Sequence, residues 1–301
     1  MSNISNTSPS LGRAWMIFIR ERFPPAANVV MAIFFSLGNA AVAARLAGVP
    51  FPVLRWNVAA VVTVLFFFRL RCFDEIKDYA VDLALNPTRP LARGLLSLRQ
   101  VRIMFGLVTA AEFLLVAPLG FPALATHAAA VAYSYLMYRE FFIGRWLRPR
   151  LTTYAVTHTA VSILLGFSIA AQVIGPTQAM FPLRGLAFGL VNWMLFNVFE
   201  FGRKTFAPEE EKPGADSYSS LFGAWGAVAL CMSQVGIALL VLGRLFGESV
   251  PQQGLASMLL ATGVVYVLRP TRATARAYRA VTGVYLILFY MLLAVQVWPG
   301  G

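Results

Sequence analysis

Nine long apolar segments follow one another along the chain, and they limit its fold more than any other feature. At a rise of about 1.5 Å per residue, a helix in each segment can cross a hydrocarbon core of about 30 Å, although the fourth and eighth segments are near the lower limit. Transmembrane strands would be about 10 residues long and alternate in polarity, which these segments do not. The sequence therefore predicts an all-α polytopic membrane protein, with about nine transmembrane helices bundled around a central cavity. The segments lie near residues 26–48, 52–72, 98–118, 121–138, 151–174, 183–202, 218–243, 253–268 and 278–298.

The composition agrees with a membrane protein. Of the 301 residues, 58% are hydrophobic and 13% are charged, and the mean hydropathy is +0.69, which is too apolar for one soluble core. The chain has no clear repeat and no linker long enough to separate soluble domains. We therefore expect a short cytoplasmic segment, residues 1–25, followed by a single membrane domain, residues 26–301, whose first span is an uncleaved anchor.

The net charge of +12 is distributed in a way that excludes nucleic acid as the partner. Most of the 25 basic residues fall before the first span or after the second, fourth, sixth and eighth spans, and the intervening loops carry few. By the positive-inside rule, the N-terminus and the basic loops face the cytoplasm, and the C-terminus lies outside. The predicted location is the cell (inner) membrane. The basic groups lie within residues 13–22, 77–102, 139–150, 203–212 and 269–279.

Nine of the 13 acidic residues occupy two short windows. The windows follow the second and sixth spans, so both are expected at the cytoplasmic side, where they can share one site. The first window holds Asp74, Glu75, Asp78 and Asp82, and the second holds Glu200, Glu209, Glu210, Glu211 and Asp216.

The first window places Asp74, Asp78 and Asp82 on one helical face, because residues four apart lie on the same side of a helix. A cation among the carboxylates offsets their repulsion. Hard oxygen ligands favour Mg²⁺, which takes its other ligands from water and phosphate, so the stripe indicates a metal–diphosphate site. The alternative is a solvated helix end balanced by Lys77, Arg71 and Arg89.

The turn NPTRP follows this stripe. Its two prolines stiffen the loop, and the planar guanidinium of Arg89 suits a pair of phosphate oxygens. Basic and acidic groups therefore alternate here, as a magnesium–diphosphate ligand requires.

These residues resemble the first signature of the UbiA superfamily of intramembrane prenyltransferases. The signature runs N-D-x-x-D-x-x-x-D and continues with a P-x-R-P turn and a glycine. Its opening Asn falls on Asp74, and every later spacing agrees. The matching positions are Glu75, Asp78, Asp82, Pro87, Arg89, Pro90 and Gly94.

Two further elements resemble the same superfamily. The segment EFGRKTFAPEEEKPGADSYSSLFG is similar to its second acidic signature, with Glu200 in the leading acidic position and the cluster 209–211 in the later ones. Arg203 and Lys204 stand where acidic or neutral residues are more usual. The run YLMYRE resembles the Y-x-x-x-K-R element, with Tyr135 on the tyrosine and Arg139 on the lysine.

The resemblance implies a Mg²⁺-dependent enzyme, with Mn²⁺ as an alternative ion, that ionises an isoprenoid diphosphate. The prenyl group would pass to a lipophilic acceptor, for which an aromatic compound is expected. The expected catalytic residues are Asp74, Asp78, Asp82 and Glu200, which together with Glu210 would hold the metal. The expected substrate-binding residues are Lys77, Arg89, Tyr135, Arg139, Arg203 and Lys204.

Two other functions remain open from the sequence. A UbiA-type terpene cyclase begins with the same ionisation but quenches the cation within the same chain. A membrane transporter would instead carry acidic residues near the middle of its spans, and here most acids lie at helix ends. Glu112, inside the third span, is a buried acid and hence a functional candidate whose partner the sequence does not identify. His158, in the fifth span, is expected to make a packing contact between helices.

Overall fold

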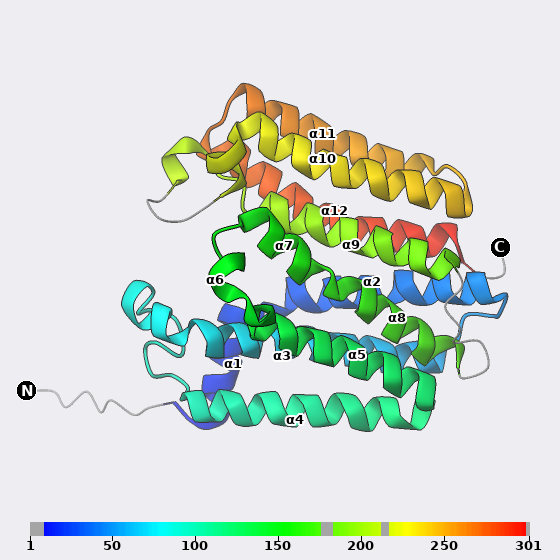
Figure 1. Cartoon of the computed structure of the whole chain (residues 1–301), viewed down its shortest axis with the longest axis horizontal. Coiled ribbons are helices and arrows are strands. Elements are labelled where there is room, and N and C mark those ends of the chain that lie inside the picture. The colour runs from blue at the N-terminus through cyan, green and yellow to red at the C-terminus, as the bar shows by residue number, and fades with distance from the viewer. Residues whose placement is uncertain (1–8, 176–182, 212–216, 299–301) are drawn as a thin grey trace, which may run out of the picture.

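The structure is a computed structural model that describes residues 9–175, 183–211 and 217–298, and these residues form helices and no strands. Asp216 and Lys212 of the second acidic window, and the last three residues of the chain, lie outside them. Long helices that follow one another along the chain run antiparallel, and together they form one bundle (Figure 1). Their bounds are α1 Leu11–Arg22, α2 Pro25–Ala47, α3 Val53–Leu85, α4 Leu98–Val116, α5 Phe121–Tyr138, α6 Gly144–Leu147, α7 Leu151–Thr159, α8 Val161–Ile174, α9 Leu183–Arg203, α10 Tyr218–Phe246, α11 Val250–Leu268 and α12 Arg272–Gln296.

Seven helical segments within the described residues are long and apolar enough to cross a membrane. They correspond to α2, α3, α4, α7 with α8, α9, α10 and α12. The other two predicted spans, the fourth and the eighth, became α5 and α11, which are 18 and 19 residues long, are not among the seven and pack within the same bundle. The all-α, multi-pass prediction is therefore confirmed, and the two segments predicted to be near the length limit are the two that fall outside this set.

Local sequence signals set many of the helix ends. Pro25 begins α2 at a position where its missing N–H costs nothing, and Gly48 ends the helix in the left-handed conformation. The side chains of Ser97, Ser217 and Thr271 cap the first turns of α4, α10 and α12. These ends determine where the loops that carry the candidate site begin.

Close approaches and buried polar pairs hold the helices together. Gly38 of α2 lies against Tyr290 of α12, and an added Cβ there would come within 2.8 Å of that ring. Asn192 of α9 donates to Asn39 at 2.7 Å and accepts from the Tyr290 hydroxyl at 2.8 Å. Because lipid offers no hydrogen bonds, such pairs define which helices meet.

A second buried network joins the other half of the bundle. The guanidinium of Arg69, on α3, donates to Glu112 on α4 at 2.8 Å and to Ser134 on α5 at 2.8 Å. The other oxygen of Glu112 lies 3.1 Å from Nε2 of His127, and all four side chains are buried. The partner of Glu112 that the sequence left unidentified is therefore a pair, Arg69 and His127.

The N-terminal segment forms an additional helix, α1, at the end of the bundle where α3 ends (Figure 1). Ala14 and Phe18 pack against Cys72 and Leu91, and Arg22 pairs with the buried Glu75. The carboxylate of Glu75, which belongs to the first acidic window, is therefore paired with α1.

Candidate functional site

The two acidic windows lie at the same end of the bundle, where α3, α5 and α9 end (Figure 1). Arg203, in the last turn of α9, is near enough to Asp74 of α3 to act on its charge. The candidate site therefore draws on segments that are more than 100 residues apart in the sequence.

The three carboxylates of the stripe have different surroundings. The side chain of Asp74 is 52% exposed, and its one ion pair is a loose contact of 3.5 Å with Arg71. Asp78 is partly exposed and, within the described residues, has no hydrogen bond to its carboxylate and no ion pair closer than 4 Å. Asp82 is buried, and both of its oxygens are occupied by Arg89. Asp74 and Asp78 are therefore the carboxylates of this window that are available to a ligand.

The NPTRP turn folds back on α3. The backbone N–H of Arg89 donates to the carbonyl of Asn86, and Nδ2 of Asn86 donates to Asp82 at 3.0 Å. The side chain of Arg89 then reaches Asp82 at 2.6 Å. The predicted phosphate-binding arginine and the predicted third metal ligand thus neutralise each other.

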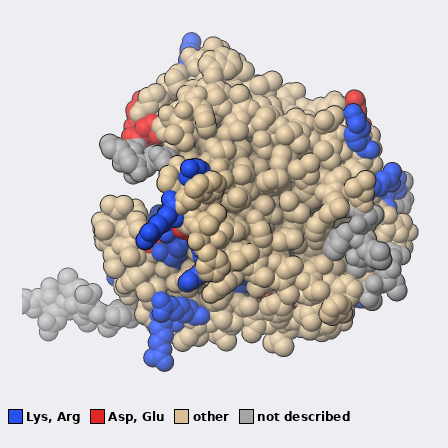
Figure 2. Space-filling model, in the orientation of Figure 1, with Lys and Arg blue, Asp and Glu red and all other residues tan. Residues whose placement is uncertain are grey.

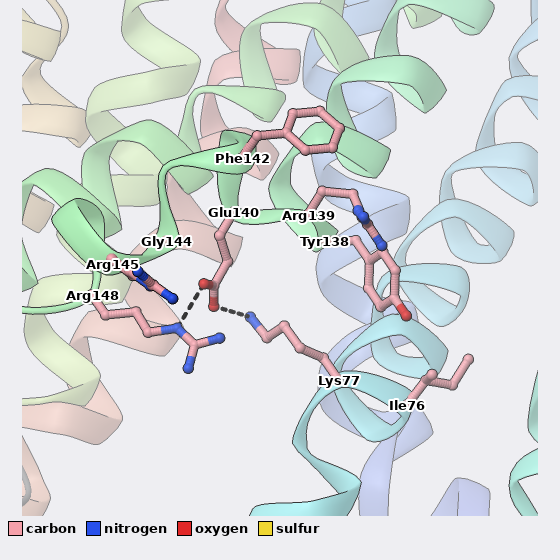
Figure 3. Close-up of a pocket in the computed structure, with 9 residues that line it drawn as sticks. All are labelled: Ile76, Lys77, Tyr138, Arg139, Glu140, Phe142, Gly144, Arg145 and Arg148. Atoms are coloured by element: carbon pink, nitrogen blue, oxygen red, sulfur yellow. Dashed lines mark hydrogen bonds and ion pairs between the residues drawn. The ribbon is translucent and has the colours of Figure 1, made fainter.

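A cavity of about 620 Å³ opens beside this window. Figure 2 shows basic side chains gathered in a hollow at the left of the molecule, the end at which α3 and α5 finish in Figure 1. Its lining combines four basic groups with one carboxylate, so it is strongly suited to an anion. The lining residues are Ile76, Lys77, Tyr138, Arg139, Glu140, Phe142, Gly144, Arg145 and Arg148 (Figure 3).

Lys77 connects the cavity to the acidic stripe. Its ammonium group donates to the hydroxyl of Tyr154, on α7, at 2.8 Å and lies 3.9 Å from Glu140. Asp74 and Asp78 are near enough to act on its charge. Lys77 is therefore placed between the available carboxylates and the anion cavity, where its positive charge can act on the carboxylates and on a bound phosphate.

Tyr135 and Arg139, predicted from the third motif, lie at the end of α5. Arg139 lines the cavity, and its guanidinium stands 5.5 Å from the Phe142 ring, pointing away from Glu140 (Figure 3). Tyr135 is half exposed and lies among aromatic rings next to Phe73 and Tyr138. The cavity therefore includes Arg139, whereas Tyr135 is not among its lining residues.

The predicted residues at the end of α9 pair with one another. Glu200 accepts from Arg203 at 2.5 Å and lies 3.4 Å from Lys204. The two unusual basic residues of the second motif are therefore the partners of its leading acid, which explains how the charges balance locally.

The three glutamates that follow bind residues of α12 and of the start of α10. Glu209 accepts from the backbone N–H of Arg272, Glu211 from the hydroxyls of Ser217 and Ser219. Glu210 accepts hydrogen bonds of 2.8 Å from the two terminal nitrogens of the Arg279 guanidinium. These hydrogen bonds lower the pKa of the Glu210 carboxyl. All three carboxylates therefore have a structural contact.

The five predicted metal ligands do not form one cluster, since the described residues contain no group of three or more acidic, histidine or cysteine side chains placed to hold an ion. The pair Asp74 and Asp78 nevertheless fits Mg²⁺. This ion is commonly held by one or two carboxylates and completes its shell with water and substrate phosphate. A metal at this end would therefore depend on water or on a phosphate ligand for part of its coordination.

Sequence reasoning did not identify four residues of the site: Glu140, Arg145, Arg148 and Tyr154. The arginines were counted only as charges in a cytoplasmic loop, although their spacing of three, with Gly144 before them, was visible in the sequence. Glu140 and Tyr154 carried no signal of their own, because their roles come from the approach of α7 and the loop after α5 to Lys77.

Two solved structures share this architecture. One belongs to a study of digeranylgeranylglyceryl phosphate synthase in membranes; it is 12% identical, with a TM-score of 0.59 over 95% of this chain and 98% of that one. The other is the apo structure of a UbiA homologue from Aeropyrum pernix K1, 18% identical, with a TM-score of 0.62 over 87% and 98%. Comparison with protein-family profiles and with curated proteins finds no match. The chain therefore shares its fold with these two proteins, one of them a UbiA homologue, which agrees with the resemblance of its motifs.

Proposed function

We propose that the protein is an intramembrane prenyltransferase that ionises an isoprenoid diphosphate and transfers the prenyl group to a lipophilic acceptor. The observation that carries this proposal is the cavity lined by four basic side chains, next to the available carboxylates of Asp74 and Asp78, at one end of a UbiA-type bundle. Anion-binding and metal-binding groups are thus combined where a diphosphate needs both.

In this proposal the basic residues of the cavity bind the diphosphate. Lys77, Arg139, Arg145 and Arg148 neutralise its oxygens, and this matters most while charge builds on the leaving group. Asp74 and Asp78 would hold Mg²⁺, and a bound Mg²⁺ would supply further positive charge to the same leaving group. Asp82, Glu200 and Glu210 remain proposed ligands from the motif resemblance, and each would have to exchange its basic partner for the ion.

The reaction is a substitution at an allylic carbon. The bond between that carbon and the diphosphate oxygen breaks, and both electrons leave with the oxygen. The resulting allylic cation takes an electron pair from the acceptor, which then loses a proton. The apolar surroundings of the bundle exclude water, which would otherwise quench the cation.

The orientation follows from the distribution of charge. The basic loops and the site face the cytoplasm in this proposal, the N-terminus lies on the same side, and the C-terminus lies on the other. The protein would sit in the cell membrane with its anion cavity open to soluble diphosphates.

Purified protein in lipid nanodiscs, supplied with C10, C15 and C20 allylic diphosphates and a lipid extract as acceptor, tests the proposal. We expect release of inorganic pyrophosphate together with a prenylated lipid detected by mass spectrometry, and loss of both in excess EDTA. Pyrophosphate release with a cyclic hydrocarbon and without any acceptor would indicate a terpene cyclase. Uptake of an intact diphosphate by proteoliposomes, without pyrophosphate release, would replace the proposal with a transporter.

A further inference from the structure

The anion cavity contains one carboxylate of its own, that of Glu140 (Figure 3). The residue is only 7% exposed. One of its oxygens accepts a hydrogen bond from Nε of Arg148 at 2.6 Å, and the other lies 3.9 Å from the ammonium of Lys77. Its two oxygens therefore connect a cation of α3 with a cation that directly follows α6, as two oxygens of a phosphate would.

The backbone is shaped to keep this carboxylate in the cavity. Glu140, Phe141 and Phe142 have φ angles of 50°, 54° and 59°, a run of left-handed conformations that residues with side chains rarely adopt. The ring of Phe141 packs edge-on against Tyr133 and His158, which anchors the middle of the turn. Such a turn persists only where its surroundings stabilise it, and such turns are concentrated at functional sites.

Gly144 provides a second, independent constraint. A Cβ at this position would clash with Oε2 of Glu140, the oxygen that faces Arg148. A side chain at residue 144 would therefore force this carboxylate oxygen to move from the place where it meets Arg148. The left-handed turn and Gly144 therefore both favour the contact between Glu140 and Arg148.

We propose that Glu140 is a positioning residue that holds Lys77 and Arg148 as an internal counter-anion, and that an incoming diphosphate must displace it. The inference rests on the proposed function of this cavity as a diphosphate site. The carboxylate keeps the two cations aligned, and it competes with the substrate for them. Glu140 therefore sets how strongly the cavity discriminates the doubly and triply charged diphosphate from weaker monoanions, because only a highly charged ligand displaces it.

Removal of the charge separates this role from a merely structural ion pair. In Glu140→Gln the amide no longer competes for Arg148 and Lys77, so inorganic pyrophosphate should bind more tightly by roughly tenfold, within the range usual for coupled binding events. A purely structural contact predicts equal or weaker binding, because its loss would only disorder the two cations.

The experiment is calorimetric titration of the full-length protein in nanodiscs with inorganic pyrophosphate and, separately, with chloride. Glu21→Gln is the matched control: Glu21 also pairs with an arginine, Arg93, at the same end of the molecule but outside the cavity, and its variant should bind as the wild type does. We also expect chloride to bind measurably to Glu140→Gln and not to the wild type. Unchanged or weaker pyrophosphate binding in a folded Glu140→Gln protein overturns the proposal.

Gly144→Ala gives a second measurement that does not alter any charge. Its methyl group expels the Glu140 carboxylate from its place, so it should also tighten pyrophosphate binding. If Glu140→Gln fails to fold, this variant decides, and wild-type or weaker affinity overturns the proposal. The product assay is run in parallel. If the wild type forms product but neither variant gains affinity, the role of Glu140 is wrong and the proposed function stands. If the variants gain affinity but the wild type forms no product, the proposed function is wrong and the role of Glu140 as a counter-anion stands.

Discussion

The carboxylate of Asp82 lies with both oxygens, at 2.6 and 2.7 Å, against a single guanidinium nitrogen of Arg89. One turn earlier on the same helix, the carboxylate of Asp78 has no partner this close within the described residues. Of these two aspartates of one motif, Asp82 therefore contributes an ion pair to the folded chain and Asp78 does not.

This difference separates two substitutions that the motif alone treats as equal. Asp78→Ala should abolish prenyl transfer and leave stability unchanged, because no contact of its carboxylate is lost. Asp82→Ala should abolish transfer and also lower stability by about 1–3 kcal/mol, since it leaves the partly buried Arg89 unpaired. Thermal unfolding in detergent, next to the product assay, checks both. Full activity of Asp78→Ala would contradict its role at the metal.

Asp74 occupies the position where the signature has Asn. Asp74→Asn keeps one oxygen that can ligate Mg²⁺ and should retain activity with a weaker apparent affinity for the ion, whereas Asp74→Ala has no such oxygen. Because each 1.36 kcal/mol in the barrier is about tenfold in rate, the two variants should differ by orders of magnitude. Initial rates across a Mg²⁺ titration measure this. Identical curves for the two variants would show that Asp74 is not a ligand.

The buried pair of Arg69 and Glu112 should dominate stability in its half of the bundle. Glu112→Ala leaves the guanidinium of Arg69 without its counter-charge in the interior and should cost about 3–5 kcal/mol. The double variant Arg69→Met with Glu112→Leu should recover much of this loss, because neither charge is then unpaired. Melting temperatures of the two variants in the same detergent compare them. A double variant less stable than Glu112→Ala would refute the interpretation.

The contact of Glu210 with Arg279 predicts a pH dependence. The hydrogen bonds from Arg279 lower the pKa of Glu210 in the folded protein below its usual value of 4.5, so the unfolded chain binds the proton more readily. The stabilisation is therefore complete above pH 4.5 and is lost as the pH falls through the lower, folded pKa. Glu210→Gln should be less stable than the wild type at pH 7, and this difference should shrink towards pH 3. A constant difference between the two proteins over that range would contradict it.

The sidedness of the site can be tested by single cysteines. Cysteine at Pro87 and at Pro208 should react with an impermeant maleimide only from the cytoplasmic side, and cysteine at Glu248, at the opposite end of α10, only from the other. The two native cysteines, Cys72 and Cys231, are buried and should contribute little background. Labelling of Pro87 and Pro208 from opposite sides would exclude one site shared by the two windows.

The extent and order of the helices were predictable because hydropathy and end signals are local properties. The fourth apolar segment, 121–138, has the same bounds as α5, and the fifth has the bounds of α7 and α8 together. The break between α7 and α8 at Ala160 was not predicted, since no proline or glycine marks it. Capping residues such as Ser97 mark a boundary in the sequence, whereas a break inside an apolar run depends on what packs around it.

The sequence by itself determined the helical membrane class and the resemblance to the UbiA superfamily. It also predicts Asp74, Asp78 and Lys77 as site residues, because residue spacing along one helix places side chains without any knowledge of its neighbours. Only the tertiary structure decided which charges pair. Arg89 pairs with Asp82, and Arg279 pairs with Glu210. Arg22 of α1 pairs with Glu75, and a left-handed turn brings Glu140 to Lys77 and Arg148. A hydrogen bond forms only when donor and acceptor come within about 3.2 Å. These pairings therefore follow from how the helices approach one another, which hydropathy and motif spacing do not encode.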